Sequence, residues 1–166
     1  MTPEERWAYD LAVVPYSSKS ANLADYGCYG IPVVAPAAGV VVEIHDGEPD
    51  QTPGVLVKNP VNPGGNWIAI QLDETGTFLI LAHLKPDRMM VSAGDHVSEG
   101  QELGRCGNSG NSSEPHIHIH HQRENPRVTA RGWAEGLPLY FRDLDGDAMP
   151  QGGLDGGIVQ HIGANE

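Results

Sequence analysis

Alternating histidine and isoleucine residues give this chain its clearest chemical feature. The run is Glu114-Pro115-His116-Ile117-His118-Ile119-His120-His121. Alternate side chains of a strand project from one face about 6.6–6.8 Å apart, so His116, His118 and His120 should share a face opposite the isoleucines. Two neighbouring imidazoles can bind one metal ion through Zn–N bonds of about 2.0–2.1 Å, whereas the outer pair is too far apart unless the strand bulges. The pattern predicts a metal-binding or catalytic strand. The alternative is a polar face of solvated histidines.

The composition predicts one β-rich domain. A chain of 166 residues is the size of one domain, and its 21 glycines and 13 prolines favour short strands and turns over long helices. The net charge of −12 argues against nucleic acid as a partner. We expect no membrane span, because no apolar stretch is long enough. The N-terminal residues do not resemble a signal peptide, so either export does not apply or an upstream segment has been lost.

Turn-rich segments divide the chain into predicted strands. Residues 67–72 and 77–82 should form a hairpin, and residues 8–14 read as a mostly buried strand. The other predicted strand segments are 31–36, 39–44, 91–104 and 116–120. We therefore expect an all-β fold, a compact antiparallel β-sheet over residues 1–142. Residues 143–166 are acidic and glycine-rich and are expected to be a separate tail.

Several side chains outside the histidine strand are also candidates for function. A carboxylate at Asp10, inside an apolar segment, is costly unless it is paired or binds a cation; backbone amides or an arginine could also hold it. His83, between the apolar residues Ala82 and Leu84, could be a hydrogen-bonded core histidine. The remaining histidines are expected to be solvated: His45, His96, His121 and His161.

The chain has two cysteines, and their pairing is left open by the sequence. Cys28 and Cys106 each lie beside a glycine at an expected strand edge. A disulfide would suit an exported protein, and two buried thiols are an equal alternative. Binding of a metal ion by a cysteine is a third and less favoured alternative, because the spacing of the two cysteines fits no common zinc motif.

Six motifs, in order, carry a family resemblance that extends over about residues 7–141. They are Ala8-Tyr9-Asp10-Leu11, the segment 32–41 (PVVAPAAGVV), the segment 65–70 (GNWIAI), Ala82-His83-Leu84, the segment 93–104 (AGDHVSEGQELG) and the segment 107–118 (GNSGNSSEPHIH). In these six motifs and in their order, the chain resembles the lysostaphin/LytM-type zinc metallopeptidases. The resemblance implies a compact barrel-sandwich-like β core with long loops around a groove. It also implies a zinc cofactor, hydrolysis of short peptides in bacterial peptidoglycan, and a location outside the cell or in the periplasm.

The resemblance also implies roles for individual residues. The second histidine of the family's His-x-His pair is a zinc ligand and falls on His118, and the family's metal-binding aspartate falls on Asp10. The histidines that flank the attacked carbonyl fall on His116 and His83. The loop before the histidine strand forms a wall of the family's substrate groove, and it contains Asn108, Ser109 and Gly110.

The chain departs from the family at the first metal ligand. The family has a histidine four residues before the aspartate, where this chain has Arg6, and a guanidinium cannot bind zinc. Three explanations are open. His120 could complete a shifted site with Asp10 and His118. A histidine upstream of Met1 could serve in a longer chain. Arg6 could instead place its charge near Asp10 and leave a metal-free relic.

Two other functions remain open at this stage. A degenerate member of the family could bind cell-wall peptides or regulate another hydrolase without catalysis, and Arg6 supports that reading. The segment 91–104 also resembles the hairpin of biotinyl and lipoyl carriers. A carrier needs a lysine at an exposed turn, and none of Lys19, Lys58 and Lys85 lies in such a setting.

Overall fold

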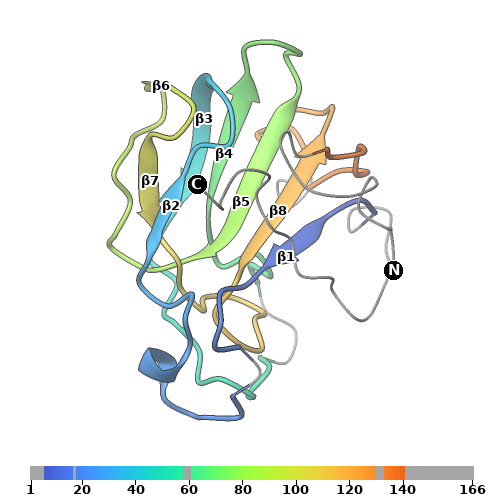
Figure 1. Ribbon diagram of the computed structural model, residues 1–166. Coiled ribbons are helices and arrows are strands. Elements are labelled where there is room, and N and C mark those ends of the chain that lie inside the picture. The colour runs from blue at the N-terminus through green and yellow to red at the C-terminus, as the bar shows by residue number, and fades with distance from the viewer. Residues whose placement is uncertain (1–5, 17, 58–60, 130–132, 141–166) are drawn as a thin grey trace.

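A computed structural model of the chain describes residues 6–16, 18–57, 61–129 and 133–140 (Figure 1). The predicted boundary at residues 142 and 143, and the tail beyond it, lie outside these ranges. Within them the chain is almost entirely β-structure, with one short 3-10 helix, η2 (Leu23–Asp25). The predicted all-β, antiparallel fold is therefore confirmed. The described residues contain no helix long and apolar enough to cross a membrane.

Two antiparallel sheets make up the fold. The larger sheet has the strand order β1-β8-β5-β4-β3-β6, and the smaller pairs β2 with β7. The strands of the large sheet are β1 (Tyr9–Leu11), β8 (Ile117–Gln122), β5 (Phe78–Leu84), β4 (Asn66–Leu72), β3 (Gly39–His45) and β6 (His96–Val97). The small sheet consists of β2 (Pro32–Val34) and β7 (Glu102–Arg105).

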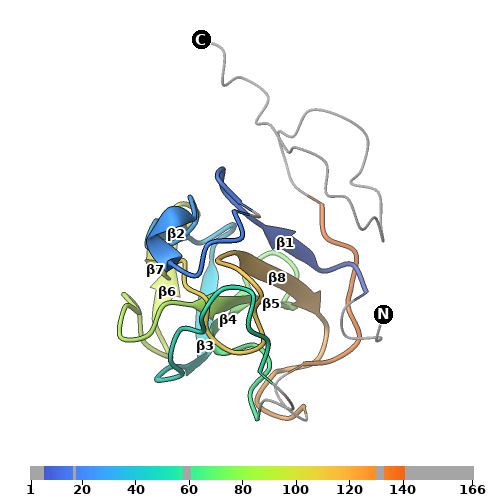
Figure 2. The ribbon, with the colours of Figure 1, turned by 90° about the horizontal axis from the view of Figure 1, so that it is seen from below.

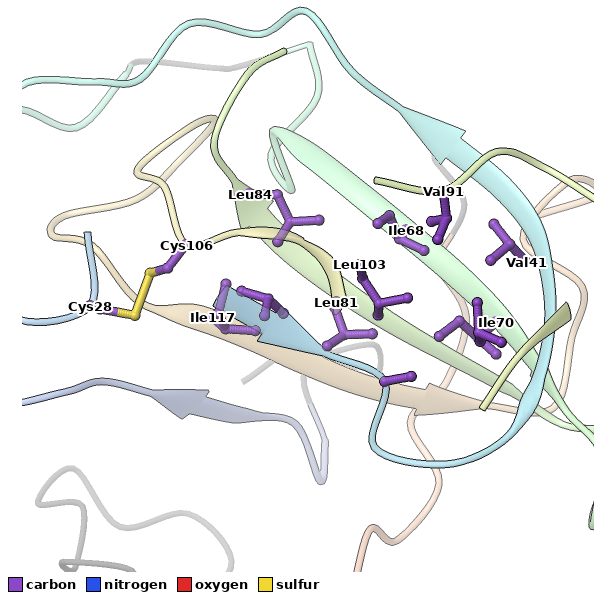
Figure 3. Close-up of a cluster of buried hydrophobic side chains, with 13 residues drawn as sticks. Cys28, Val41, Ile68, Ile70, Leu81, Leu84, Val91, Leu103, Cys106 and Ile117 are labelled. Carbon is purple, nitrogen blue, oxygen red and sulfur yellow. A yellow bond between two sulfur atoms is a disulfide. The ribbon is translucent and has the colours of Figure 1, made fainter. Parts of the chain in front are cut away.

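The hydrophobic core fills the space between the two sheets (Figure 3). Ile68, Leu81 and Leu84 of the large sheet and Leu103 of the small sheet are almost fully buried there. The β4–β5 hairpin supplies most of the core from the large sheet, and its existence was predicted from the sequence. Burying a leucine or isoleucine side chain contributes about 1.5–3 kcal/mol, and Ile117 of β8 packs in the same core, which anchors the histidine strand to this layer.

The strand that carries Asp10 differs from the prediction. β1 covers Tyr9–Leu11 alone and lies at the edge of the large sheet, beside β8 (Figure 2). None of its three residues is buried, so the expectation of a mostly buried strand over 8–14 was wrong. An edge strand has one neighbour in the sheet, and alternating apolar residues do not reveal which strands lie at an edge.

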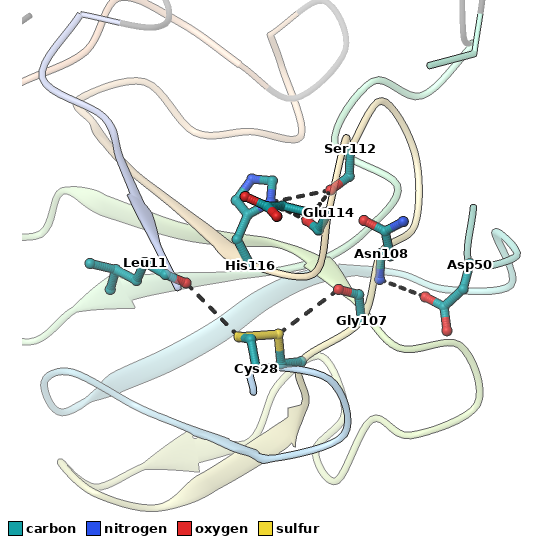
Figure 4. Close-up of a disulfide and its surroundings, with 9 residues drawn as sticks. Leu11, Cys28, Asp50, Gly107, Asn108, Ser112, Glu114 and His116 are labelled. Carbon is teal, nitrogen blue, oxygen red and sulfur yellow. Dashed lines mark hydrogen bonds between the residues drawn. A yellow bond between two sulfur atoms is a disulfide. The ribbon is translucent and has the colours of Figure 1, made fainter. Parts of the chain in front are cut away.

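The two cysteines form a disulfide between the segment before β2 and the residue after β7. Cys28 and Cys106 have Cα atoms 5.8 Å apart, and both side chains are buried (Figure 4). Backbone hydrogen bonds join the same segments, from Gly30 N to the Cys106 carbonyl at 2.8 Å and from Cys106 N to the Ile31 carbonyl at 3.0 Å. Of the alternatives that the sequence left open for the two cysteines, the structure contains the disulfide.

Candidate active site

The histidine strand β8 presents two chemically different faces. Ile117 and Ile119 are buried on the core side, while His118 and His120 lie on the opposite face. Across the strand pairs, His118 lies opposite Asp10 of β1 and Ala82 of β5, and His120 lies opposite Ile80. We call this side of the sheet, which carries Asp10, His118 and His120, the site face. The predicted proximity of Asp10 and His118, which are 108 residues apart in sequence, is confirmed.

Asp10 interacts with two imidazoles at once. Its Oδ1 atom lies 2.9 Å from His118 Nδ1 and 3.5 Å from His116 Nε2. The premise that Asp10 would be buried was wrong, because its side chain is 64% exposed, whereas the two histidines are 12% exposed. Desolvation opposes ionisation, but the His116 and His118 rings outweigh it and hold the pKa of the Asp10 carboxyl well below its usual range. The carboxylate is therefore ionised at neutral pH.

His116, immediately before β8, is held by the loop that precedes it. Its Nδ1 atom lies 2.7 Å from the Glu114 carbonyl oxygen and 3.2 Å from Ser112 Oγ (Figure 4). A carbonyl can only accept a hydrogen bond, so Nδ1–H is the donor and Nε2 faces Asp10. Desolvation lowers the pKa of His116, but the hydrogen bond and charge of Asp10 outweigh it and raise that pKa above its ordinary value.

His83 reaches the site face through a β-bulge in β5. Asn66 pairs with Leu84 and Ile68 pairs with Leu81, so Ala82 and His83 together oppose Trp67. Strict alternation from Leu81 would turn His83 into the core. The bulge instead places Leu84 in the core and His83 beside the other histidines, with φ of 63°. Left-handed backbone at a residue other than glycine is uncommon, and such strain concentrates at functional sites.

The His83 ring is buried and has a defined hydrogen bond. Its Nδ1 atom lies 2.8 Å from the Ser109 carbonyl oxygen, so Nδ1–H donates there. The ring centroid is 4.7 Å from that of His116 and 6.1 Å from that of His118. Burial, together with the charge of His116, lowers the pKa of His83 to about 3. His83 is therefore neutral at neutral pH.

His120 lies deeper, beneath Trp133. The ring is fully buried and stacks on the Trp133 ring at 5.4 Å, and Trp133 also lies 4.9 Å from His118. Neither His120 ring nitrogen has a hydrogen-bond partner within the described ranges. Gln122 and the Ala134 backbone lie near the ring and act to raise the His120 pKa, although neither meets the geometry of a hydrogen bond to it. Burial, reinforced by His118, lowers the pKa of His120 to about 4.

The residues predicted to bind zinc are brought together only in part. Asp10 and His118 fit as two donors, because Asp10 Oδ1 and His118 Nδ1 are 2.9 Å apart, close enough for both atoms to contact one ion. His120 shares their face, but its ring centroid is 6.4 Å from that of His118. Among the residues that the structure describes, no three histidine, cysteine or acidic side chains are grouped closely enough to hold one ion.

Arg6 does not occupy the space beside Asp10. Its guanidinium forms an ion pair with Glu135 at 3.3 Å, and both side chains are more than half exposed. The backbone of Arg6 packs against Gly136, where a side chain would collide with the Arg6 carbonyl and touch the His120 ring. The relic hypothesis, which placed the arginine charge near Asp10, is therefore not supported by this geometry.

The predicted groove loop contributes mainly internal contacts. The Asn108 and Ser109 side chains are fully buried and donate to the carbonyls of Gln51 and Leu84. Gly110 lines a cavity of about 370 Å³ with Glu48, Gln51 and Asn62. A substrate contact at this loop remains a prediction, and Gly110 is the member placed to make one through its backbone.

The histidines predicted to be solvated have partners away from the site. His45 lies 3.4 Å from Glu48, His96 lies 2.8 Å from Asp73, and His121 lies 2.7 Å from Thr77 Oγ1. His161 lies outside the described residues. Sequence reasoning found no sign of Trp133, and it included Ser112 and Asn66 only as members of longer motifs without a role of their own. The contacts of all three side chains are tertiary, and no local pattern predicts them.

The chain was compared with known families and curated proteins. The profile of Peptidase family M23 matches residues 23–130, a range that begins after β1 and so leaves out Arg6 and Asp10. Two Vibrio cholerae proteins match about half of the chain: Peptidoglycan DD-endopeptidase ShyA (34% identity over 88 residues, 51% of this chain and 20% of that protein) and ShyC (30% over 89 residues, 51% and 20%). The chain thus spans about a fifth of the length of these curated relatives.

Solved structures were compared in the same way. The catalytic domain of the antimicrobial peptidase lysostaphin from Staphylococcus simulans is 20% identical, over 80% of this chain and 90% of that chain, with a TM-score of 0.46. A zinc-containing peptidase from Vibrio cholerae is 22% identical, over 57% of this chain and 24% of that chain, with a TM-score of 0.43.

Proposed function

Because the chain belongs to peptidase family M23, we propose that it is a zinc-dependent endopeptidase that hydrolyses short peptide linkages in bacterial peptidoglycan. The observation that carries the proposal is the Asp10–His118 pair with the His116 and His83 rings beside it on one face of the sheet. A structural cluster would not need a carboxylate and three imidazoles within contact of one another. The names of the Vibrio cholerae relatives support peptidoglycan as the substrate.

Asp10 and His118 are the proposed zinc ligands, and His120 is the proposed third. The support for His120 is chemical: it is a neutral, buried imidazole on the same strand face, and its nitrogens have no hydrogen-bond partner among the described residues. Its participation requires side-chain rearrangement, because the three groups do not yet surround one point. When bound, zinc polarises a carbonyl and lowers the pKa of a water molecule.

The two remaining histidines supply proton transfer. Both donate Nδ1–H to a backbone carbonyl, which leaves Nε2 of each ring for the reaction. His83 is neutral, so its Nε2 can accept a proton from the attacking water. The raised pKa of His116 favours a proton on Nε2, which this ring can donate to the leaving amine.

A non-catalytic member of the family is the second candidate function. Two features favour it: Arg6, which the family resemblance aligns with the first metal ligand, and the incomplete grouping of metal donors among the described residues. Such a protein would bind cell-wall peptides in the same groove or regulate another hydrolase. Either function suits the cell envelope, and the buried Cys28–Cys106 disulfide supports an oxidising compartment of that kind.

Digestion of purified peptidoglycan tests the proposal. The zinc-loaded chain is expected to release new peptide ends, detected by mass spectrometry of the soluble fragments. His116→Ala should retain the fold and reduce the rate about 10²–10⁴-fold, the usual contribution of acid–base catalysis. His96→Ala removes an exposed histidine bound to Asp73 and serves as the matched control. Sedimentation with peptidoglycan but no cleavage by the zinc-loaded chain would favour the binding function instead.

A further inference from the structure

We propose that Asn66 and Ser109 are positioning residues, which fix the backbone bulge and the ring orientation of His83. The mechanistic consequence of this inference rests on the proposed function, in which His83 accepts a proton at Nε2. The geometric claim stands on the contacts alone. Both side chains are polar and fully buried; Asn66 is the first residue of β4, and Ser109 lies in the loop between β7 and β8.

Ser109 contacts the bulge at two places. Its carbonyl oxygen accepts the Nδ1–H of His83 at 2.8 Å, and its hydroxyl donates to the Leu84 carbonyl at 2.8 Å. The same hydroxyl accepts a hydrogen bond from Asn66 N at 2.9 Å. One residue therefore holds both the ring of His83 and the backbone of the residue that follows it.

Asn66 holds the bulge from the neighbouring strand. Its Nδ2 atom donates to the carbonyls of Leu84 at 3.0 Å and Glu48 at 2.8 Å, and its Oδ1 atom accepts from Glu48 N at 2.8 Å. The Leu84 carbonyl thus accepts hydrogen bonds from both Asn66 and Ser109. This carbonyl lies one residue after the left-handed His83, at the Asn66–Leu84 pair where the β4–β5 pairing resumes beyond the bulge.

Backbone contacts complete the enclosure of His83. Its N–H donates to the Gly64 carbonyl at 3.0 Å, and its carbonyl accepts from Gly107 N at 3.1 Å. Gly65, with φ of 61°, packs directly against Ser109, where a side chain at residue 65 would collide with it. A strained residue persists when its surroundings over-determine it, and here the segments 64–66 and 107–109 do so.

The arrangement determines which nitrogen of His83 is available. With Nδ1–H donated to Ser109, the neutral ring keeps its lone pair on Nε2. A ring released from this hydrogen bond would populate the other tautomer, whose Nε2–H cannot accept a proton. Asn66 and Ser109 therefore act on the reaction through His83, without contacting substrate.

Nitrogen-15 NMR of the histidine rings in the metal-free full chain near neutral pH tests the inference directly. The unaltered chain is expected to show His83 as the Nδ1–H tautomer. Ser109→Ala and Asn66→Ala keep the Ser109 carbonyl that accepts from His83 but remove side-chain hydrogen bonds that hold the carbonyl and the ring in register. A misplaced carbonyl weakens the Nδ1–H bond, so the tautomer ratio should shift about two- to tenfold toward Nε2–H, at most the value of one full hydrogen bond. Ser109→Thr retains the hydroxyl and should keep the original tautomer.

Asn108→Ala is the matched control for this spectrum. Asn108 is an equally buried amide that bonds to the Gln51 carbonyl and not to Leu84. Its removal should lower stability and leave the His83 ring resonances unchanged. If Asn66→Ala does not fold, Ser109→Ala decides, because it removes one oxygen and leaves no large cavity.

Kinetics separate this inference from the proposed function. If the chain cleaves peptidoglycan, Ser109→Ala should lower kcat about tenfold with little change in KM. If the chain cleaves nothing, the proposed function fails while the tautomer measurement still decides the geometric claim. An unchanged His83 tautomer in folded Ser109→Ala and Asn66→Ala, or an equal shift in Asn108→Ala, would overturn the inference.

Discussion

Replacing His83 by alanine and by glycine measures the backbone strain at the bulge. Both variants lose the imidazole, so they differ from each other only in a methyl group and in backbone freedom. At φ of 63°, alanine should be penalised by roughly 1–2 kcal/mol, and glycine should not. The matched pair is Ala82 and Ala82→Gly, one residue earlier in β5, where the alanine is fully buried and has no positive φ.

The magnitude follows from three contributions. Alanine to glycine in a strand costs about 0.5–1 kcal/mol in chain entropy, and the lost buried methyl costs about 0.8 kcal/mol. Ala82→Gly should therefore lower the free energy of unfolding by about 1.5 kcal/mol. At residue 83 the relief of strain offsets these two costs, so the alanine and glycine variants should be nearly equal in stability. Replacing alanine by glycine should therefore cost about 1–2 kcal/mol less free energy of unfolding at residue 83 than at residue 82.

Urea unfolding of the four metal-free proteins supplies the measurement. The comparison is valid if the m-values agree, because the variants then expose the same surface on unfolding. A glycine variant at residue 83 that is less stable than the alanine variant by the same amount as Ala82→Gly would refute the left-handed conformation. It would also remove the reason for His83 to lie on the site face.

Three further predictions concern stability and the edge of the site. Cys28→Ser with Cys106→Ser opens a loop of 78 residues, for which chain entropy gives about 4.5 kcal/mol, so urea unfolding should show a loss of about 2–4.5 kcal/mol; a loss below about 1 kcal/mol would contradict this. The hydrogen bond from Asn62 outweighs desolvation and, with His45, lowers the pKa of Glu48 below 4.5. Its contribution is therefore present above about pH 4.5 and lost as the pH falls through the lowered value, and Glu48→Gln should unfold with a weaker acid dependence than the unaltered chain. Arg6→Ala removes an exposed ion pair and should change the free energy of unfolding by less than about 1 kcal/mol and leave zinc uptake unchanged; a loss of zinc would show that Arg6 supports the site.

The elements of the site with a local pattern could be predicted from the sequence. Alternation in residues 116–120 correctly predicted that the isoleucines face the core and the imidazoles face away. The meeting of Asp10 with His118 followed from the family resemblance, since nothing local links residues so distant in sequence. The position of β1 at the sheet edge was not predictable in this way, because exposure depends on which strands pair.

His83 shows where strand periodicity fails. Alternation in β5 predicts that the His83 side chain faces the core. One additional residue in the strand moves every side chain beyond it to the opposite face of the sheet. The bulge is stabilised by Asn66 and Ser109, which come from a different strand and a distant loop. Trp133, which covers His118 and His120, likewise reaches the site through tertiary packing alone.

Zinc stoichiometry of the purified chain, measured by elemental mass spectrometry after dialysis at neutral pH, tests the central claim most directly. The account predicts one zinc ion per chain, lost in His118→Ala and retained in His116→Ala. Loss of the metal in His120→Ala would identify His120 as the third ligand, and its retention would show that another group serves. A chain that takes up no zinc, or an His118→Ala variant that binds it as well as the unaltered chain, would contradict the account.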